Sequence, residues 1–530
     1  MGGRRRKHWG WGFEDQQPSL ADLRDSVPLY AAALGVPVSE PVEPVPLDRA
    51  ELPAVRVQAP ADLEDICRAD AHTRASHALG KSYSDVVEGF AGRFAHAPDV
   101  VARPVSEEHV ERVLEWCSAE RLAVIPYGGG TSVVGGVTPR VDSSYNGSVS
   151  LDLGALDRVL DVDQTSRSAH IQAGALGPAL EEQLRASGMT LRHFPQSFEY
   201  SSLGGWIATR AGGHFATLWT HIDDFVESVR AVTPAGAWES RRLPGSGAGV
   251  SPDRMLIGSE GALGVITDAW VRVQPRPTHR STAGVRFADL MRGAECVRAI
   301  SQSGLHPSNC RLLDPGEAAL TKAGDGSHAL LVLGFESTDH PVEAAMQRAL
   351  ALCAEHGGEV GEARSSDGAD AVSSWREAFL GAPYLRDSLV ALGVLSETFE
   401  TAITWERFPD FHQRVRAAAE DAVREVCGGG RVFCRFTHVY PNGPAPYFTV
   451  IAPARRGEEI EQWRVIKAAA SEAIIAAGGT ITHHHAVGRD HRPWYDRQRP
   501  QPFAAALTAA KGAVDPAGVM NPGVLVDPVR

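Results

Sequence analysis

Three glycine-rich stretches constrain the fold of this 530-residue chain more than any other feature. The first, PYGGGTSVVGG at 126–136, directly follows LAVIP at 122–126, an apolar run that predicts a buried strand. Glycines lack a Cβ atom, so consecutive N–H groups in such a loop can form a concave nest for phosphate oxygens. Alone, a GGG sequence is more often a flexible turn than a ligand site, and its spacing matches neither a Walker loop nor GxGxxG.

Two further stretches of the same kind lie downstream, PQSFEYSSLGGWIATRAGG at 195–213 and GSEGALGVIT at 258–267. Each again joins a small-residue backbone to short hydroxyl side chains. Three such stretches in one part of the chain favour a large dinucleotide ligand. The candidate cofactor-binding residues are Pro126, Tyr127, Gly128, Gly129, Gly130, Thr131, Ser132, Gln196, Ser197, Ser201, Ser202, Thr209, Arg210, Ala211, Gly212, Glu260, Gly261, Ala262, Leu263, Gly264, Val265 and Ile266.

The apolar pattern around these stretches predicts a mixed α+β domain at 94–278. After His109, four apolar residues fall at i, i+3, i+4 and i+7 and predict one face of a helix, namely Val110, Val113, Leu114 and Cys117. Short β-branched segments predict strands at 149–153, 159–163 and 169–174. A helix is expected at 175–188, with Pro178 in its first turn.

The rest of the chain is expected to form three further parts. Residues 1–93 are rich in proline and acidic residues and predict an N-terminal wrapping segment with a helical stretch at 63–68. QPRP at 274–277 ends the first domain, and 279–500 alternates helical stretches with strands, which predicts a second, α/β domain. Residues 501–530 predict a helix that ends in a Pro/Gly turn.

Composition excludes several classes of protein. A net charge of −13 gives no electrostatic footprint for binding nucleic acid. Seven cysteines without CxxC spacing indicate neither a disulfide framework nor a structural zinc site, and so favour a reducing compartment. No apolar stretch approaches the length of a membrane span, and the basic N-terminus lacks the apolar region of a secretory signal. We therefore expect a mature, cytoplasmic protein. Only five of the 52 basic residues are lysine, an arginine bias that indicates a GC-rich bacterial genome.

Three consecutive histidines, His483, His484 and His485, stand in GGTITHHHAVG at the end of an expected strand. On a strand they would alternate faces, so one or two could reach a shared pocket, where a neutral imidazole supplies a base near pH 7. A metal site is the alternative interpretation. Alternating side chains and the lack of a nearby carboxylate cluster in the sequence argue against it, so no metal is expected.

Together with 223–236 and 515–523, the glycine-rich stretches resemble the FAD-binding family typified by vanillyl-alcohol oxidase and p-cresol methylhydroxylase. The resemblance implies an FAD-binding domain with the pyrophosphate on the glycine loop, and a cap domain that holds the substrate pocket. It also implies that 501–530 returns to the FAD site. Because the loop contains no histidine that could tether the flavin, we expect non-covalent FAD. A bulky residue at Gly129 is expected to fill the space of the pyrophosphate and empty the site.

The histidine run, with KHWGWGFED, CRLLD at 310–314, and the segments 383–406 and 434–448, resembles the alkyldihydroxyacetonephosphate synthase family over nearly the whole chain. This resemblance implies exchange of the acyl chain of acyl-dihydroxyacetone phosphate for a long-chain alcohol in ether-lipid synthesis. It also implies a homodimer. Two alternatives stay open. One is an FAD-dependent 2-hydroxy-acid (D-lactate- or glycolate-type) dehydrogenase or oxidase, which usually carries Glu-His-Gly in place of the histidine run. The other is a flavin-binding protein without catalysis.

The same resemblance implies roles for individual residues. Tyr447 would move the proton at the first substrate carbon, His484 within its run would deprotonate the alcohol, and Arg386 would hold substrate phosphate or the leaving carboxylate. Arg311 and His193 match other residues tied to activity. The alternative for each is a structural role, since tyrosines and arginines in such strands often serve packing, and Arg311 could simply brace the cap.

Two departures from the synthase pattern stand out. Gln196-Ser197 replaces Asp-Ser, and Ala486 replaces a glycine after the histidine run. If the backbone there has a positive φ, the methyl group of Ala486 is costly. The apolar residues around Trp375, Phe379, Leu380 and Tyr384 could make a peripheral membrane contact, although a place in the core is the alternative we favour.

Overall fold

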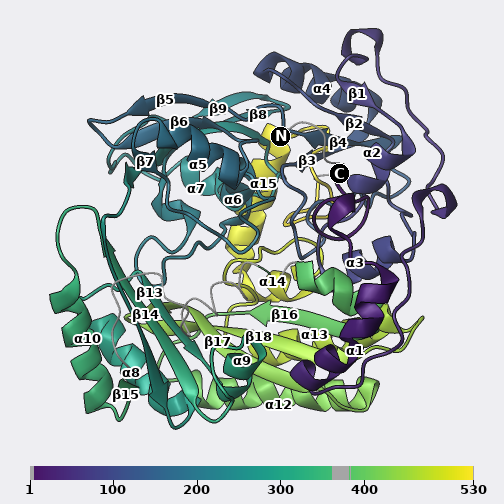
Figure 1. Cartoon of the computed structure of the whole chain (residues 1–530). Helices are drawn as coiled ribbons and strands as arrows, with labels where there is room; N and C mark the ends of the chain where they lie inside the picture. Colours follow the sequence, from purple (N-terminus) through teal and green to yellow (C-terminus); the bar gives the residue numbers. More distant parts are fainter. Residues whose placement is uncertain (1–4, 361–380, 382–383, 529–530) are drawn as a thin grey trace.

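The computed structural model describes residues 5–360, 381 and 384–528 of the chain (Figure 1). Within them, two large hydrophobic cores form. One is built from residues between 57 and 273 together with residues of the C-terminal segment, and the other mainly from residues 283–477. We refer to these two parts as the glycine-loop part and the cap. None of the described helices is both long and apolar enough to cross a membrane.

The glycine-loop part contains two main sheets with helices around them. One has the order β1-β2-β4-β3 and the other the order β5-β6-β10-β8-β9. Their strands are β1 (Cys67–Arg68), β2 (Val100–Ala102), β3 (Leu122–Tyr127), β4 (Gly147–Asp152), β5 (Val159–Asp163), β6 (Ser168–Gln172), β8 (Val226–Thr233), β9 (Gly236–Glu239) and β10 (Val265–Arg272), while β7 (Met189–Thr190) pairs with β11 (Gln274–Pro275). The helices and turns are η2 (Leu47–Arg49), η3 (Ala61–Leu63), α2 (Ala71–Ser76), α3 (Tyr83–Phe90), α4 (Glu107–Glu120), α5 (Gly177–Arg185), α6 (Leu203–Thr209), η4 (Ile222–Asp224) and α7 (Asp253–Leu256).

Most local predictions for this part are confirmed. The helix α4 buries the predicted face, and the strand before the glycine loop is β3, which pairs in parallel with β4. The predicted helical stretch at 63–68 is wrong. A short 3-10 turn, η3, ends there, and Cys67 and Arg68 pair with β2 instead. Cross-strand pairing outweighs local helix preference in so short a segment.

The cap is a seven-stranded antiparallel sheet of order β15-β12-β14-β13-β17-β18-β16. Its strands are β12 (His279–Phe287), β13 (Asn309–Leu313), β14 (Ala329–Ser337), β15 (Glu359–Val360), β16 (Val394–Glu400), β17 (Arg431–Tyr440) and β18 (Gly443–Pro453). The long helices α8 (Leu290–Gln302), α10 (Glu343–Glu355), α12 (Phe408–Cys427) and α13 (Glu459–Ala476) pack against it at the bottom of Figure 1, and α9 (Pro315–Leu320) lies beside β17.

Side-chain alternation divides the central cap strands into two faces. Cys434, Phe436 and Phe448 belong to the hydrophobic core that the helices complete. Arg435 and Tyr447, their neighbours in sequence, point to the opposite face, toward the glycine-loop part. A period of two is the geometry of a strand, and here it separates packing residues from candidate site residues.

Both ends of the chain pack across the two parts. The N-terminal segment contains η1 (Glu14–Gln16) and α1 (Leu20–Leu34), while α14 (Arg492–Gln498) and α15 (Gln501–Val514) precede the C-terminus. After α15 the chain pairs with β3, where the Val124 N–H donates to the carbonyl of Val519 at 2.8 Å. The buried Lys511 ammonium donates to the carbonyls of Ala262 and Met520 and to Asp515. The C-terminal segment therefore completes the core beneath the glycine loop.

Ala486, just after the histidine run, has a backbone φ of +73°. This is the left-handed region, which costs an L-residue roughly 1–2 kcal/mol and glycine nothing. Glycine in turn loses more backbone entropy on folding and gives up the buried methyl group, so these terms offset one another at this position.

We therefore predict that Ala486→Gly leaves the free energy of unfolding nearly unchanged. The matched variant Ala419→Gly, within α12, should lose about 1 kcal/mol or more because a helical alanine gains nothing from glycine's freedom. Denaturant unfolding of both variants measures the difference. An equal loss at the two positions would contradict a strained backbone at Ala486.

Candidate active site

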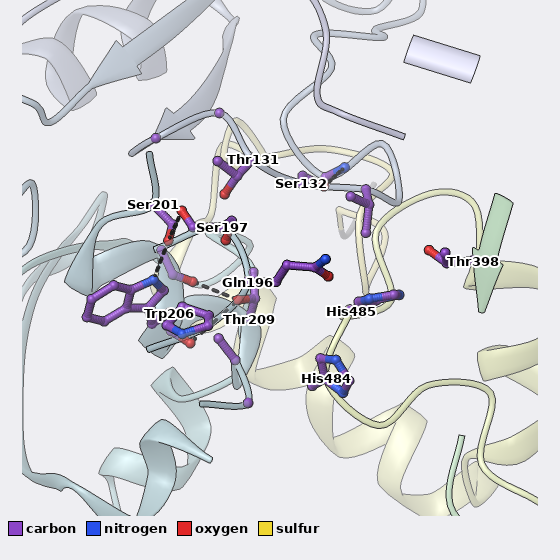
Figure 2. A pocket seen from close by; sticks show the side chains of 18 of the residues that line it. Thr131, Ser132, Gln196, Ser197, Ser201, Trp206, Thr209, Thr398, His484 and His485 are labelled. Carbon is purple, nitrogen blue, oxygen red and sulfur yellow. Dashed lines mark hydrogen bonds between the residues drawn. The ribbon is translucent and has the colours of Figure 1, made fainter. Parts of the chain in front are cut away.

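A cavity of about 350 Å³ lies between the glycine-loop part and the cap. The glycine loop and the segment 195–213 line one side, and β16, β17, β18 and the histidine run line the other. Figure 2 shows Thr131, Ser132, Gln196 and Ser197 on the first side, with His484, His485 and Thr398 across from them.

The glycine loop leaves β3 and packs directly on residues 200–202. A Cβ atom at Gly129 would lie 1.6 Å from the carbonyl oxygen of Tyr200, and Gly130 has a φ of +69°. The expectation that a side chain at Gly129 would fill ligand space is therefore wrong, because it would collide with the protein backbone instead. Within the described residues, the N–H groups of Gly129, Gly130, Thr131 and Ser132 donate to no protein acceptor. Such a row of N–H groups can bind a diphosphate.

Most of the predicted cofactor residues line the cavity, and four do not. Arg210 points away and pairs with the carboxylate of Asp223 at 2.7 Å. Ala262, Leu263 and Val265 pack in the hydrophobic core. At the start of β10 the alternation of a strand explains the outcome, since Val265 faces the core while Ile266, and Gly264 just before the strand, line the cavity.

The histidine run is not on a strand, contrary to the sequence-based expectation. Residues 480–488 form an irregular loop that wraps around the carboxylate of Glu400 at the end of β16. The backbone N–H groups of His483, His484 and His485 donate to this carboxylate, and so does the hydroxyl of Thr482. Burial alone would raise the pKa of Glu400, but the neighbouring imidazoles and Thr482 lower it well below its usual range. Glu400 is therefore a buried anion that fixes the loop.

Two of the three histidines reach the cavity. His484 and His485 line it beside Tyr447, with ring centroids 6.2 and 5.6 Å from the tyrosine ring. Burial lowers the pKa of His484 to about 3 and that of His485 to about 4, so both are neutral at pH 7 and can accept a proton. The third, His483, does not line the cavity and bonds to the Tyr440 hydroxyl at 2.7 Å.

The histidines also bear on the expectation that no metal binds. Nitrogen atoms of His438, His483 and His484 lie within 4.8 Å of one another, a spacing that would suit a metal ion. The argument from alternating side chains fails because the run is a loop. The absence of a metal stays a prediction.

Among the described residues, three arginines face the cavity. Arg311 is 3% exposed, and burial lowers its pKa to about 9, with a further decrease from the neighbouring Arg435. Arg386 lines the cavity and donates to the carbonyl of Lys81 at 2.8 Å. Arg435 pairs with the buried carboxylate of Glu317. Among the residues predicted from sequence, Tyr447, Arg311, Arg386, His484 and His485 therefore surround one cavity.

His193 does not line the cavity. It is 1% exposed and packs between the rings of Trp206 and Phe225, and burial lowers its pKa to about 3. Its ring lies behind Gly213, where a Cβ atom would come 2.7 Å from the imidazole Nδ1. A packing role behind the cavity wall suits this position better than contact with a ligand.

Sequence reasoning missed several lining residues. They are Trp11, Glu317, Ser396, Thr398, Arg435, Thr437, His438 and Thr449. The sequence did contain a signal for some of these residues. In two otherwise apolar strands, polar residues occupy alternate positions, namely Arg435 and Thr437 in β17 and Tyr447 and Thr449 in β18. No comparable signal pointed to Trp11, which comes from the N-terminal segment, where its N–H donates to Asp387 at 2.8 Å.

The residues considered for a membrane contact are only partly described. Trp375, Phe379 and Leu380 lie outside the described residues. Tyr384 is half-buried, and its hydroxyl bonds to the Tyr200 hydroxyl at 2.8 Å and to Glu199. Tyr384 thus contacts the glycine-loop part.

Comparison with known proteins agrees with this geometry. Residues 98–240 match a family model described as an FAD binding domain, and residues 276–525 match the C-terminal domain of FAD linked oxidases. The chain is 28% identical over 494 residues to the alkyldihydroxyacetonephosphate synthase of Dictyostelium discoideum, covering 88% of this chain and 80% of that protein.

Solved structures extend the comparison. An alkyldihydroxyacetonephosphate synthase aligns over 97% of this chain and 98% of its own, with a TM-score of 0.80 and 25% identity. A p-cresol methylhydroxylase with bound substrate aligns over 96% and 98%, with a TM-score of 0.69 and 14% identity, and so shares the fold. The expected α+β fold, an FAD-binding domain of the vanillyl-alcohol oxidase type with a cap domain, is confirmed. The chain belongs to the FAD-binding enzymes of the alkyldihydroxyacetonephosphate synthase type, and FAD is its cofactor.

Proposed function

We propose that this protein is an alkyldihydroxyacetonephosphate synthase, which exchanges the acyl chain of acyl-dihydroxyacetone phosphate for a long-chain alcohol. The observation that carries the proposal is the mixed chemistry of the cavity. Arg311, Arg386 and Arg435 face it, while Glu317, paired with Arg435, neutralises one positive charge. The guanidinium groups of Arg311 and Arg386 add further positive charge to the same cavity, which suits an anionic group such as a phosphate. Apolar side chains of Leu34, Leu320, Leu385, Leu389 and Ile451 line the same cavity and suit an alkyl chain.

The glycine-loop side of the cavity fits FAD. The row of free N–H groups at 129–132 would hold its diphosphate, and the small residues of 195–213 and 258–267 leave room for the backbone to approach the cofactor. When bound, the flavin supplies reversible covalent chemistry at the substrate carbon without net oxidation or reduction.

The side chains of the cap supply proton transfer and charge. Tyr447 takes the proton from the first carbon of the substrate, which lies next to a carbonyl group, and returns a proton to this carbon at the end of the exchange, so that the product keeps two hydrogens there. His484, neutral at pH 7, accepts the proton of the incoming alcohol and passes it to solvent. In the net exchange, the C–O bond of the ester breaks with its electron pair on the leaving carboxylate, and a C–O bond to the alcohol oxygen forms. Arg311 and Arg386 compensate the charge of the phosphate and of the leaving carboxylate.

Glu400 positions His484, the proposed base, and lies behind the histidine run. Its carboxylate holds the N–H groups of the histidine run, and its negative charge favours the protonated form of His484 once the alcohol proton arrives. Glu260 anchors the following residues in the same way, since its carboxylate accepts from the N–H groups of Val487 and Gly488 at 2.9 and 2.7 Å. The loop is thus fixed from both sides of the cavity.

The FAD is expected to be non-covalent, because the glycine loop contains no histidine that could tether the flavin. Denaturing the purified holoprotein should release all flavin as free FAD, which is measured by fluorescence of the supernatant after precipitation. Flavin that stays with the polypeptide after the same treatment would contradict the prediction.

Tyr447→Phe and His484→Ala should each lower the rate of ether formation by roughly 100-fold or more with flavin content unchanged. The assay measures labelled fatty acid released from acyl-dihydroxyacetone phosphate with hexadecanol, and the ether product alongside it. His340→Ala, at an exposed histidine after β14 that does not line the cavity, is the control and should keep the wild-type rate. Full activity in both variants would overturn the roles given to these residues.

The same assay separates the synthase from its alternative. If the wild-type protein makes no ether lipid but reduces an electron acceptor with D-lactate or glycolate, it is an FAD-dependent 2-hydroxy-acid dehydrogenase or oxidase. Production of ether lipid with no bleaching of the flavin by these acids supports the synthase.

We further propose that the protein acts as a homodimer in the bacterial cytoplasm and contacts the membrane peripherally. Both substrates carry long apolar chains, which favours collection from a bilayer. Analytical ultracentrifugation should give twice the chain mass, and a monomer would contradict the homodimer.

Flotation with phosphatidylglycerol–phosphatidylethanolamine vesicles should carry the protein upward. Protein that stays at the bottom of the gradient would contradict the membrane contact.

A further inference from the structure

Arg435 occupies a central place in the cavity that the mechanism above does not use. It lies on β17 directly opposite Tyr447 on β18, and β16 places Glu400 opposite Tyr447 on the other side. The guanidinium carbon of Arg435 lies 3.9 Å from the centroid of the Tyr447 ring. The sheet therefore holds the catalytic tyrosine between a buried cation and a buried anion.

The surroundings of Arg435 keep its guanidinium charged and in place. It is 7% exposed, and its Nη1 pairs with the carboxylate of Glu317, which the first turn of α9 holds in the core. Burial alone would lower the pKa of Arg435, but Glu317 and Tyr447 raise it above its ordinary value. Within the described residues, its buried Nε–H has no hydrogen-bond partner. One donor of the guanidinium is thus left beside Tyr447 and the cavity.

We propose, on the basis of the proposed function, that Arg435 is a positioning residue that holds Tyr447 and stabilises the negative charge of its phenolate before it takes the substrate proton. A phenolate is the form of tyrosine that can accept a proton, and a cation in contact with it favours that form in a site of low dielectric constant. A cation over an aromatic ring also restrains the position of the ring.

The step that Arg435 supports is balanced within the substrate and the protein. The C–H bond at the first carbon of acyl-dihydroxyacetone phosphate breaks, and its proton passes to the Tyr447 oxygen. The electron pair moves toward the neighbouring carbonyl oxygen of the substrate. No oxidant or reductant is required, and Arg435 itself neither gains nor loses a proton.

Two other roles for Arg435 would leave different kinetic signatures. If it only binds the substrate phosphate or carboxylate, its loss should raise KM and leave kcat nearly unchanged. If it only braces the sheet, its loss should lower the melting temperature or the flavin content. A role in proton removal should lower kcat and make the C–H step more rate-limiting, so the isotope effect with substrate deuterated at the first carbon should grow.

The test compares Arg435→Gln and Arg435→Lys with the wild-type FAD-loaded protein. We expect Arg435→Gln to lower kcat by roughly 100-fold, with KM and flavin content unchanged and a larger deuterium isotope effect. Arg435→Lys should keep an intermediate kcat, because it retains the charge but not the planar contact with the ring.

Arg431→Gln is the matched control. Arg431 lies on the same strand with its guanidinium carbon 4.8 Å from the centroid of the Phe433 ring, but it is exposed and does not line the cavity. It should therefore keep the wild-type kcat and isotope effect. If Arg435→Gln does not fold or does not bind FAD, the isotope effect of Arg435→Lys tests the inference instead. A value larger than that of the wild type supports the inference, and an unchanged value contradicts it.

The outcomes separate this inference from the proposed function. If the wild-type protein makes ether lipid but neither Arg435 variant changes kcat or the isotope effect, the inference is wrong and the function stands. An increase in KM alone also overturns it and makes Arg435 a ligand of the substrate anion. If the wild-type protein makes no ether lipid, the proposed function itself fails.

Discussion

The carboxylate of Glu400 is the interaction on which the arrangement of the cavity depends. An isolated charge this deep in a protein is unfavourable unless hydrogen bonds compensate for lost water. Here three consecutive backbone N–H groups and the Thr482 hydroxyl provide that compensation. Because the donors belong to the histidine run and the acceptor ends a cap strand, satisfying the charge also fixes where His484 and His485 lie. The loop has no regular secondary structure, so these hydrogen bonds to Glu400 are what place two histidines at one cavity.

Further buried groups join this loop and the C-terminal segment to the glycine-loop part. Glu260 binds the N–H groups that follow the histidine run, and burial raises its pKa to about 7. Its own carbonyl accepts from the side chain of Asn521 at 2.7 Å. Lys511 adds bonds from α15 to Ala262, next to the same stretch. The cofactor side and the proton-transfer side are therefore connected by hydrogen bonds between segments far apart in sequence.

Sequence predicted the elements whose signal is local. The face of α4 and the strand before the glycine loop followed from apolar spacing, and glycines marked a loop that does line the cavity. The failures share one physical cause, which is contact between distant segments. Residues 67–68 pair with β2, the histidine run wraps around Glu400, and Gly129 meets the backbone of Tyr200. None of these partners lies near its counterpart in the sequence, so no local pattern could reveal them. The domain limits and the roles of the site residues stay predictions.

The net charge of the chain is negative, whereas the charges that line the cavity favour an anionic ligand. The chain carries −13 overall, which argues against a polyanion spread over its surface. Inside the cavity, however, the described lining includes three arginines and the carboxyl groups of Glu260 and Glu317, and Glu317 pairs with Arg435. Burial keeps His484 and His485 neutral at pH 7. Because charges interact more strongly in a poorly hydrated space than in water, the arginines favour a small anionic group that can enter the cavity. The apolar lining beside it suits an alkyl chain. One cavity thus offers complementary surfaces to the charged headgroup and to the chain of a lipid phosphate.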